Sequence, residues 1–473
     1  MIRGVQLVET NEVNFDQFSI SLPGYMALSH RWGIAHVLST KEDNIQSHYA
    51  GIPMADLPKT FQDAVFVCST IGLSFIWIDS LCIVQDDNKD WEREAELMGD
   101  VYANAFCTIS ATAAEGSTDG FLKPRELTVP IRLDQSHPFF VTDGANVRED
   151  VNKSNLNSRG WVFQERYLSP RILHFTKSQV YWECEQGDDG FQEIGHSSGG
   201  RGWWWTSDTS LQYENPWLND WKRFVQSYSL THLTRETDRL VAIAGLVSHM
   251  IKQRPYMTFY YYGVWRDWTY NDLCWISLGS KSLRNPAGRW HAPSWSWASH
   301  NGPIAFMWAP DLKAMMRVLK YPESGLFSKG STCQVPLLVK SRLCNLPQIE
   351  STLDGLPEMI MGSITFMPAK YRQTIELLQL ITEDGKVIGW CSIDQGPQSI
   401  KGTKYFCSPI YFDSRDLSHQ KNYENDTVIY LTGYYVLVLV ESDRQSEFSR
   451  VGIGCIYETD WVDKFPLEAF TLI

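Results

Sequence analysis

Short apolar runs alternate with helical patterns over the first 185 residues, and this alternation limits the fold more than any other feature of the chain. Residues 25–29, 75–78 and 106–110 are apolar runs of strand length. Between them, apolar residues recur at helical spacing over 58–72 and 91–102. The order strand, helix, strand, helix, strand predicts an α/β domain built on a mainly parallel sheet.

The remainder of the chain changes character twice. Residues 186–330 are expected to form a helical, Trp-rich middle region, and residues 331–473 a β-rich C-terminal region, so three domains are predicted, the first being 1–185. A polar stretch over 185–210 indicates a loop at the first boundary. The strongest helical patterns of the middle region are 217–228 and 240–250, and the strongest strand patterns of the last region are 434–440 and 451–457.

The net charge and the length of the apolar runs disfavour some classes of binding partner. The chain has 473 residues, 43% of them hydrophobic, and a formal net charge of −13, which opposes binding to nucleic acid or to an anionic bilayer. The longest apolar run, 434–440, is too short to span a membrane, and the N-terminus lacks the apolar run of a signal peptide. We therefore predict a soluble, cytoplasmic protein with no membrane span.

The cysteine spacing and the known cofactor motifs give no indication of a cofactor or metal site. The 10 Cys are scattered, with no CxxC pair and no zinc-site spacing, which is typical of free thiols in a reducing compartment. The phosphate loop GxxxxGK[ST], the dinucleotide motif GxGxxG and the metalloprotease motif HExxH are all missing from the sequence. Neither a cofactor nor a metal ion is expected.

Three segments in order and at matching spacing resemble the HET domain, the fungal heterokaryon-incompatibility family. They are YMALSHRWG at 25–33, LPKTFQDAV followed by FIWIDSLCIVQDD over 57–87, and SRGWVFQERYLSPRILHF at 158–175. Weaker similarity continues through TRETDRLVAIAGL, YYGVWRDW and HAPSWSWAS, so the resemblance covers most of the first 300 residues.

The resemblance implies both a fold and a class of function. HET domains have been likened to the TIR domain, a small flavodoxin-like α/β unit, and they mediate programmed cell death when genetically different fungal strains fuse. Some TIR domains cleave NAD, whereas others only assemble. The chain is thus expected to be an effector of self/non-self recognition that acts by self-association or through another incompatibility protein. The alternatives are an enzyme that cleaves NAD or a related nucleotide, with NAD as substrate, and a tailoring enzyme of fungal secondary metabolism.

Polar residues follow two of the predicted strands, where a parallel α/β sheet binds its ligands. Ser29, His30 and Trp32 follow the first strand, and Asp79 and Cys82 follow the second. If the two strands are neighbours, these side chains meet at one edge of the sheet.

A helix predicted over 161–168 places Gln164 and Glu165 on one face with Trp161 and Leu168. Burial of an amide and a carboxylate is costly unless they are paired or used. One interpretation is that Glu165 forms a structural ion pair with Arg159, Arg166 or Arg171. The other is that Glu165 acts on a substrate.

In the enzymatic interpretation, Glu165 is the first choice and Asp79 the second for a carboxylate that stabilises an oxocarbenium-like sugar. Cys82 is a third catalytic candidate if His30 or the following helix activates its thiol, the alternative being a buried structural Cys. The residues expected to contact the substrate are Ser29, His30, Trp32, Gln85, Arg159, Trp161 and Gln164. In the structural interpretation, the same motifs form only the core of the domain.

Overall fold

The computed structural model describes residues 2–9, 24–33, 38–124, 130–132, 138–140, 147–184, 191–193, 196–197, 216–253, 259–279, 292–307, 312–322, 335–346, 348–350, 375, 377–394, 403–413, 422–423, 426–427 and 433–473. The chain divides into two compact units. Unit 1 comprises Met1–Asp208, Thr231–Thr234 and Val241–Gln253, and unit 2 comprises Thr209–Leu230, Arg235–Leu240 and Arg254–Ile473. Both predicted domain boundaries, after residues 185 and 330, and most of the predicted loop over 185–210 fall outside the described residues.

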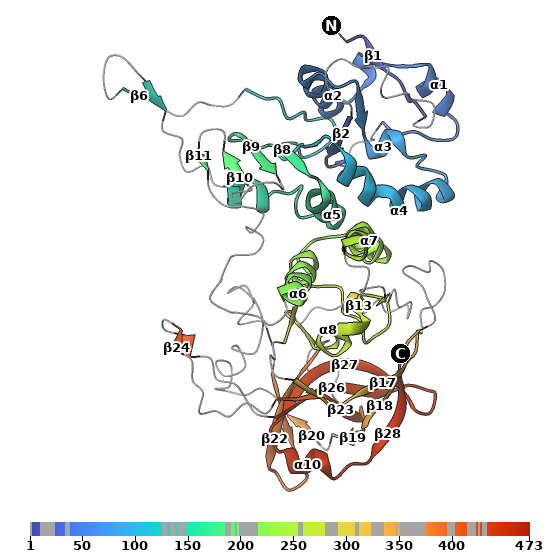
Figure 1. Ribbon diagram of the computed structural model, residues 1–473, viewed down its shortest axis with the longest axis vertical. Helices are drawn as coiled ribbons and strands as arrows, with labels where there is room; N and C mark the ends of the chain where they lie inside the picture. The colour runs from blue at the N-terminus through green and yellow to red at the C-terminus, as the bar shows by residue number, and fades with distance from the viewer. Residues whose placement is uncertain are drawn as a thin grey trace. The chain divides into compact units, whose positions relative to one another are not determined.

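Unit 1 is built on a seven-stranded sheet with the order β4-β2-β5-β8-β9-β10-β11 (Figure 1). The first four strands are parallel: β4 (Phe75–Trp77), β2 (Tyr25–Ser29), β5 (Cys107–Ser110) and β8 (Arg171–Phe175). The last three are antiparallel: β9 (Val180–Cys184), β10 (Phe191–Glu193) and β11 (His196–Ser197). Tyr25 lies opposite Phe75 in a parallel pair, which confirms that the first two predicted strands are neighbours.

The helices of unit 1 begin and end where local chemistry predicts. α2 (Lys59–Ile71) starts after Pro58 and stops at Gly72, whose left-handed φ of 91° suits a glycine helix end. α4 (Asn88–Asn104) starts after Asp87, whose side chain accepts a hydrogen bond from the Lys89 N–H. The other helices are α1 (Ile45–Ala50), α3 (Asp79–Cys82), α5 (Gly160–Leu168) and α7 (Ala244–Gln253), and the short strands are β1 (Gly4–Val5), β3 (Ile52–Pro53), β6 (Pro130–Arg132) and β7 (Pro138–Phe140).

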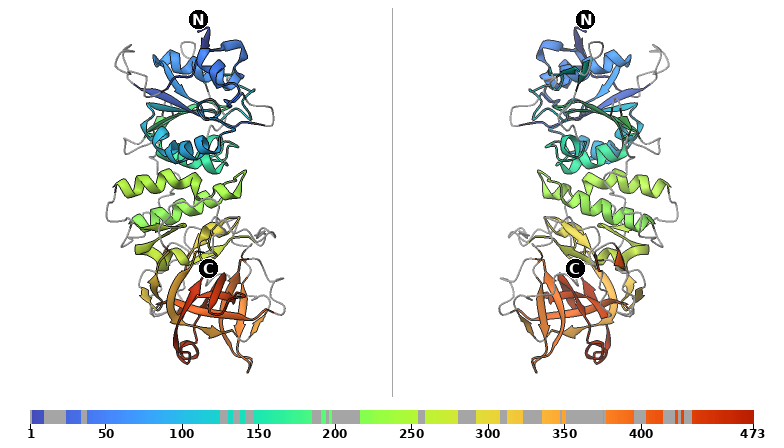
Figure 2. Two further views of the ribbon diagram at one scale, coloured as in Figure 1. Left: turned by 90° about the vertical axis from the view of Figure 1, so that its right-hand side faces the viewer. Right: turned by 90° about the vertical axis from the view of Figure 1, so that its left-hand side faces the viewer.

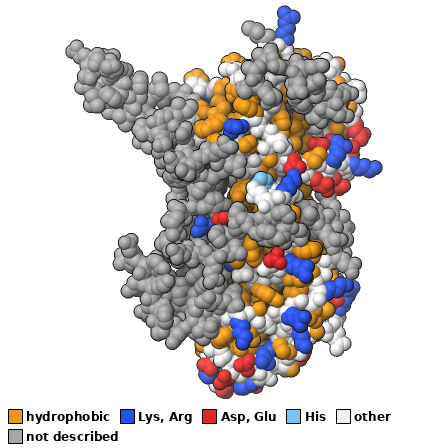
Figure 3. Space-filling view, in the orientation of Figure 1, with side chains coloured by type: hydrophobic (Ala, Val, Ile, Leu, Met, Phe, Trp, Pro, Cys, Tyr) orange, Lys and Arg blue, Asp and Glu red, His pale blue; other side chains and the backbone are white. Residues whose placement is uncertain are grey.

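Helices cover both faces of β2, because alternate residues of a strand point to opposite faces. Met26 and Leu28 belong to one core cluster with residues of α2, while Ala27 belongs to a second with Met98 and Tyr102 of α4. Burial on both faces explains why β2 is a continuous apolar run. The outer face of α4 is charged, and Figure 3 shows acidic and basic side chains gathered over it.

The order of strands reverses at β2. In chain order, β4 is added on one side of β2, and β5 is then added on the other side. The connection after β2 and the connection after β4 therefore run in opposite directions along the sheet. In open α/β sheets, such a point separates the loops and leaves room for ligands at the carboxyl ends of the strands. The fold therefore favours this edge of the sheet for a functional site.

Two glycines bring α4 and α7 into close contact within unit 1. A Cβ atom added to Gly245 would lie 2.5 Å from the Gly99 Cα and 2.8 Å from the Gln164 Oε1. We expect Gly245→Ala to cost about 1–3 kcal/mol of stability, because backbone atoms cannot give way as a side chain does. Urea unfolding of the variant would measure the loss. Gly279→Ala is the control, since its Cβ would meet nothing within 4 Å, and equal losses in the two variants would contradict the prediction.

Unit 2 joins a small helical layer to a large, mostly antiparallel sheet, whose long strands curl around one another in both views of Figure 2. The predicted strands are confirmed as β26 (Gly433–Glu441) and β27 (Glu447–Ile456), and the predicted helix over 217–228 as α6 (Pro216–Ser229). The remaining parts of this sheet are β16 (Leu312–Ala314), β17 (Arg317–Lys320), β18 (Leu337–Arg342), β19 (Cys344–Asn345), β20 (Gln348–Glu350), β21 (Leu378–Ile381), β22 (Val387–Ile393), β23 (Tyr405–Asp413) and β28 (Leu467–Leu472).

Smaller elements complete unit 2. They are β12 (Tyr260–Tyr261), β13 (Val264–Trp265), α8 (Thr269–Leu273), β14 (Trp275–Ser277), β15 (Ile304–Phe306), β24 (Asn422–Tyr423), β25 (Asp426–Thr427) and α10 (Thr459–Asp463). None of the helices in the described part of the chain combines the length and apolar character that crossing a membrane requires.

Candidate functional site

The carboxyl ends of β2 and β4 bring three of the predicted site residues together. The Trp32 Nε1 donates a hydrogen bond of 2.9 Å to the Asp79 Oδ2, and the His30 Nδ1 lies 3.8 Å from the Asp79 Oδ1. Asp79 also opens α3, where its Oδ1 accepts a 2.7 Å hydrogen bond from the Ser80 N–H. The carboxylate of Asp79 is thus held in place by one indole and one backbone donor.

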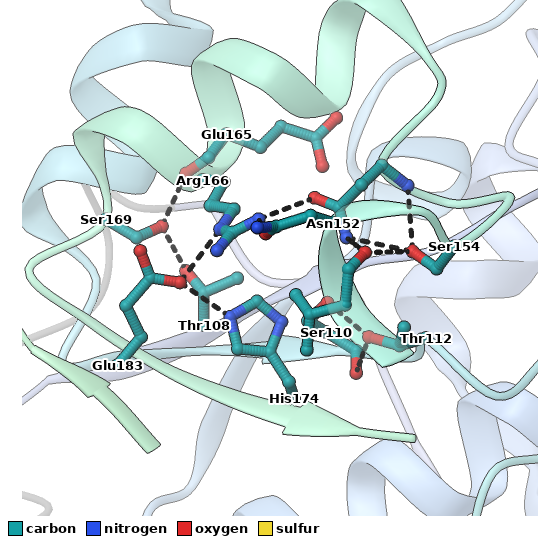
Figure 4. Close-up of polar contacts among 12 residues, drawn as sticks. Thr108, Ser110, Thr112, Asn152, Ser154, Glu165, Arg166, Ser169, His174 and Glu183 are labelled. Carbon is teal, nitrogen blue, oxygen red and sulfur yellow. Dashed lines mark hydrogen bonds and ion pairs between the residues drawn. The ribbon is translucent and has the colours of Figure 1, made fainter. Parts of the chain in front are cut away.

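Glu165 lies on the buried face of α5, and only 5% of the residue is exposed. Its backbone carbonyl accepts a 2.6 Å hydrogen bond from the Ser169 hydroxyl. Its carboxylate, however, points away from the neighbouring Arg166–Glu183 ion pair, and no dashed line reaches it in Figure 4. Within the described residues, Glu165 forms no ion pair with Arg159, Arg166 or Arg171, so the structural ion-pair interpretation of this residue finds no support.

Burial raises the pKa of the Glu165 carboxyl from 4.5 to about 7. The Ser29 hydroxyl and the Arg159 guanidinium oppose this rise, and the charge of Asp79 adds to it. Ser29 is therefore near Glu165, although the two are not joined by a hydrogen bond of ordinary geometry. A buried carboxyl that titrates near neutral pH is a common property of catalytic acids and bases.

Several buried polar atoms of this region have no hydrogen-bond partner in the described structure. They are the Ser29 Oγ, both ring nitrogens of His30, the Gln164 Nε2 and the Glu165 Oε2. Burial lowers the pKa of His30, which favours its neutral form. Nearly all buried polar atoms in proteins are hydrogen-bonded, and exceptions call for a functional explanation or an ordered water. Of these atoms, the Ser29 Oγ and the His30 ring nitrogens lie at the carboxyl end of β2.

Arg159 and Trp161 lie at the start of α5. The Arg159 NH1 donates a 2.6 Å hydrogen bond to the His30 carbonyl, so this guanidinium is tied to the end of β2. Trp161 packs edge-on against Trp91 of α4, with ring centroids 6.2 Å apart. The observed contact of Arg159 is thus with the backbone at the end of β2, and that of Trp161 is helix packing.

The side-chain amides of two predicted site residues, Gln85 and Gln164, form hydrogen bonds with backbone groups. The Gln85 Nε2 donates hydrogen bonds of 3.1 Å to the carbonyls of Asp79 and Ile83, which stabilises the α3 turn. The Gln164 Oε1 accepts a 2.8 Å hydrogen bond from the Gly245 N–H and thereby joins α5 to α7. Both contacts are structural.

The surroundings of Cys82 disfavour a thiolate. Burial raises the pKa of this thiol to about 12, and the charges of Asp79 and Glu94 add to that rise. The sulfur accepts a hydrogen bond of 3.5 Å from the Ile78 N–H. These properties favour the structural alternative for Cys82 over a nucleophile.

Sequence reasoning missed Tyr102, whose hydroxyl donates a 3.2 Å hydrogen bond to the Leu28 carbonyl. Burial raises the pKa of Tyr102, and the charge of Glu165 adds to that rise, so the phenol borders the site. Its position in the apolar stripe of α4 carried no signal of this role.

A second, charged network lies next to the site and was also missed (Figure 4). The Arg166 Nε donates a 2.8 Å hydrogen bond to the Glu183 Oε2, and the His174 Nε2 lies 2.7 Å from the same oxygen. Arg166 NH1 also donates a hydrogen bond of 3.0 Å to the Asn152 Oδ1. This network joins α5 to β8 and β9 and so fixes the helix that carries Glu165.

Residues 25–165 match the profile of the family described as Heterokaryon incompatibility protein (HET). The match begins at the first residue of β2 and ends at Glu165, and it includes every predicted site residue. Searches of curated proteins and of solved structures found no match to this chain. Residues 25–165 of this chain are therefore similar to the heterokaryon-incompatibility (HET) domain family.

Proposed function

We propose that the chain is an effector of self/non-self recognition and programmed cell death whose HET domain hydrolyses NAD or a related nucleotide, with Glu165 as the catalytic carboxylate. One observation carries this proposal. Glu165 is buried, forms no ion pair with a described residue, and has an unpartnered oxygen at the carboxyl end of a parallel sheet, beside the unpartnered Ser29 hydroxyl. A purely structural carboxylate would be stabilised by a partner.

The reaction needs few groups. The bond between nicotinamide and ribose breaks, and nicotinamide leaves with the bonding electron pair as a neutral base. The ionised carboxylate of Glu165 stabilises the positive charge that develops on the sugar. Water then adds its oxygen to the sugar and releases a proton, so the products are nicotinamide, ADP-ribose and H⁺. Asp79 is assigned to the sugar hydroxyls and Arg159 to the phosphates, because carboxylates accept and guanidinium groups donate hydrogen bonds.

The strand order supports a TIR-like, flavodoxin-like classification of the domain. Along the parallel part of the sheet, β4, β2, β5 and β8 are the second, first, third and fourth strands in chain order. Flavodoxin-like sheets follow the same order and bind their ligands at the switch point. The antiparallel strands β9 to β11 extend the sheet beyond that arrangement.

Glu165→Gln is expected to lower the rate of nicotinamide release from NAD by about a hundredfold or more, because the amide cannot supply the negative charge that stabilises the transition state. Chromatographic measurement of nicotinamide from purified wild type and variant tests this. Since the pKa of Glu165 is about 7, wild-type activity should rise with pH through that value as the carboxyl ionises.

Glu96→Gln is the matched control, because Glu96 is an exposed carboxylate on α4 and should leave the rate unchanged. Full turnover by the Glu165 variant would remove this residue from the mechanism. No nicotinamide release by wild type, both as a monomer and under conditions of self-association, would reject the hydrolase and leave assembly as the effector function. A role in fungal secondary metabolism stays a prediction.

A further inference from the structure

Two buried cysteines of unit 2 face each other across a pair of antiparallel strands. Cys344 opens β19, Cys407 lies in β23, and the register of this pair places the two residues directly opposite each other (Figure 1). Both residues are completely buried free thiols, and both belong to the same apolar core cluster. Facing residues of an antiparallel pair point to the same side of the sheet, so the two thiols are neighbours.

The backbone spacing at this position suits a disulfide bond. The Leu346 N–H donates a 3.0 Å hydrogen bond to the Tyr405 carbonyl, two residues along each strand from the cysteines. Hydrogen-bonded and non-hydrogen-bonded pairs alternate along an antiparallel ladder, so Cys344 and Cys407 form a hydrogen-bonded pair with Cα atoms about 5.5 Å apart. Because disulfides join Cα atoms about 4.4–6.8 Å apart, a bond between the two sulfurs is compatible with the existing strand pairing.

A third cysteine of the same core is a competitor for this bond. Cys391 of β22 is as deeply buried as the other two and belongs to the same cluster. Its partners in the described strands are Leu378 of β21 and Gly454 of β27, so strand pairing does not bring it opposite Cys407. The register therefore selects Cys344 as the partner of Cys407.

We propose that Cys344 and Cys407 are a redox modification site, at which a peroxide converts the two thiols into a disulfide bond. One thiolate attacks an oxygen of hydrogen peroxide, the O–O bond breaks, and the products are a sulfenic acid and water once the leaving oxygen takes up the proton. The second thiol then attacks the sulfenic sulfur and displaces a second water molecule. Two thiols and one hydrogen peroxide thus give one disulfide and two waters, with two electrons passing from sulfur to the peroxide.

The position of β19 provides a route for the oxidant. This strand is two residues long and pairs only with β23 within the described residues, and such short edge segments open locally at lower free energy than central strands. Burial raises the pKa of the Cys407 thiol, and the neighbouring Cys344 adds to that rise. Since the thiolate is the reacting form, the reaction should be slower than that of a free thiol. The site lies in unit 2 and is independent of the hydrolase proposed for unit 1.

The first test uses the purified wild-type chain and hydrogen peroxide under native conditions. After the remaining thiols are blocked, digestion without reductant and mass spectrometry should identify one cross-linked peptide pair, Cys344 with Cys407, that dithiothreitol separates. The same treatment of urea-unfolded chain should give several pairings, because its 10 cysteines then meet at random. A parallel solution of glutathione confirms that the peroxide is active. Two thiols that stay unlinked long after the glutathione is oxidised, or the same mixture from native and unfolded chain, would overturn the proposal.

Variants identify the bond and its effect on unit 2. Cys344→Ala and Cys407→Ala should each abolish the cross-link, whereas Cys391→Ala, the equally buried control, should retain it. Oxidised wild type should melt about 5 °C or more above the reduced protein, because the bond closes residues 344–407 into a loop and restricts the unfolded chain. A cross-link to Cys391, or a lower melting temperature after oxidation, would contradict a bond that fits the folded strands. The wild-type test remains decisive even if a variant fails to fold.

Discussion

Glu165→Gln is expected to stabilise the protein by about 3 kcal/mol above neutral pH, even though it removes activity. The pKa of this carboxyl is raised from 4.5 to about 7 in the folded protein by burial. Below the unfolded value of 4.5, both states hold the proton and the group contributes nothing. As pH rises, the unfolded chain loses the proton first, so the folded state is progressively penalised until about pH 7, where the penalty reaches its full size. Glutamine carries no charge and avoids this penalty.

Urea unfolding of wild type and variant at acidic and at mildly alkaline pH would measure the effect. The stability difference should appear only at the higher pH, and the exposed Glu96→Gln control should show no such dependence. A variant that is less stable than wild type at alkaline pH would mean that Glu165 has a stabilising partner after all. A residue that serves catalysis at the expense of stability is expected to give a more stable protein when its charge is removed.

Glu183→Gln is expected to have the opposite effect, a loss of about 3–5 kcal/mol at neutral pH, because it removes the carboxylate from a buried ion pair. The side chains of Arg166 and Glu183 are only 4% and 2% exposed. Burial alone would raise the pKa of Glu183, but Arg166 and His174 outweigh burial and lower it to about 2. Its contribution to stability is therefore complete above the unfolded value of 4.5 and is lost as pH falls toward 2.

Denaturant unfolding at neutral and acidic pH would again measure the change. Glu149→Gln is the matched control, since Glu149 forms an exposed ion pair with Lys153 and should cost at most about 0.5 kcal/mol. If the two variants lose similar amounts of stability, the buried network does not hold α5. Adding Arg166→Met to Glu183→Gln should recover part of the loss, because the unpaired charge is then gone.

Local chemistry explains why much of unit 1 was predictable. The limits of α2 follow from Pro58 and Gly72, which act on their own turns, and the parallel pairing of Tyr25 with Phe75 follows from the alternation of strands and helices. The meeting of Trp32 and Asp79 follows in turn, since both residues come directly after neighbouring strands.

Contacts between distant segments were not predictable. Gln164 finds its partner in Gly245, 81 positions away, and no pattern in either segment indicates this bond. Tyr102 has the spacing of a core residue, and only tertiary packing places its hydroxyl beside Glu165. Likewise, the sequence contains several carboxylates that could neutralise Arg166, and the fold selects Glu183.

The Gly245 contact also shows that the residues matching the HET family and the residues packed together in unit 1 are not the same set. Residues 25–165 carry the family's pattern, yet α5 is completed by α7, which comes from residues 244–253 after the chain has contributed α6 to the other unit. A polypeptide cut off soon after the family match would expose the side of α5 that Gln164 and Gly245 now close. The segment that matches the HET family is thus packed, in this chain, against a helix that follows it by about 80 residues.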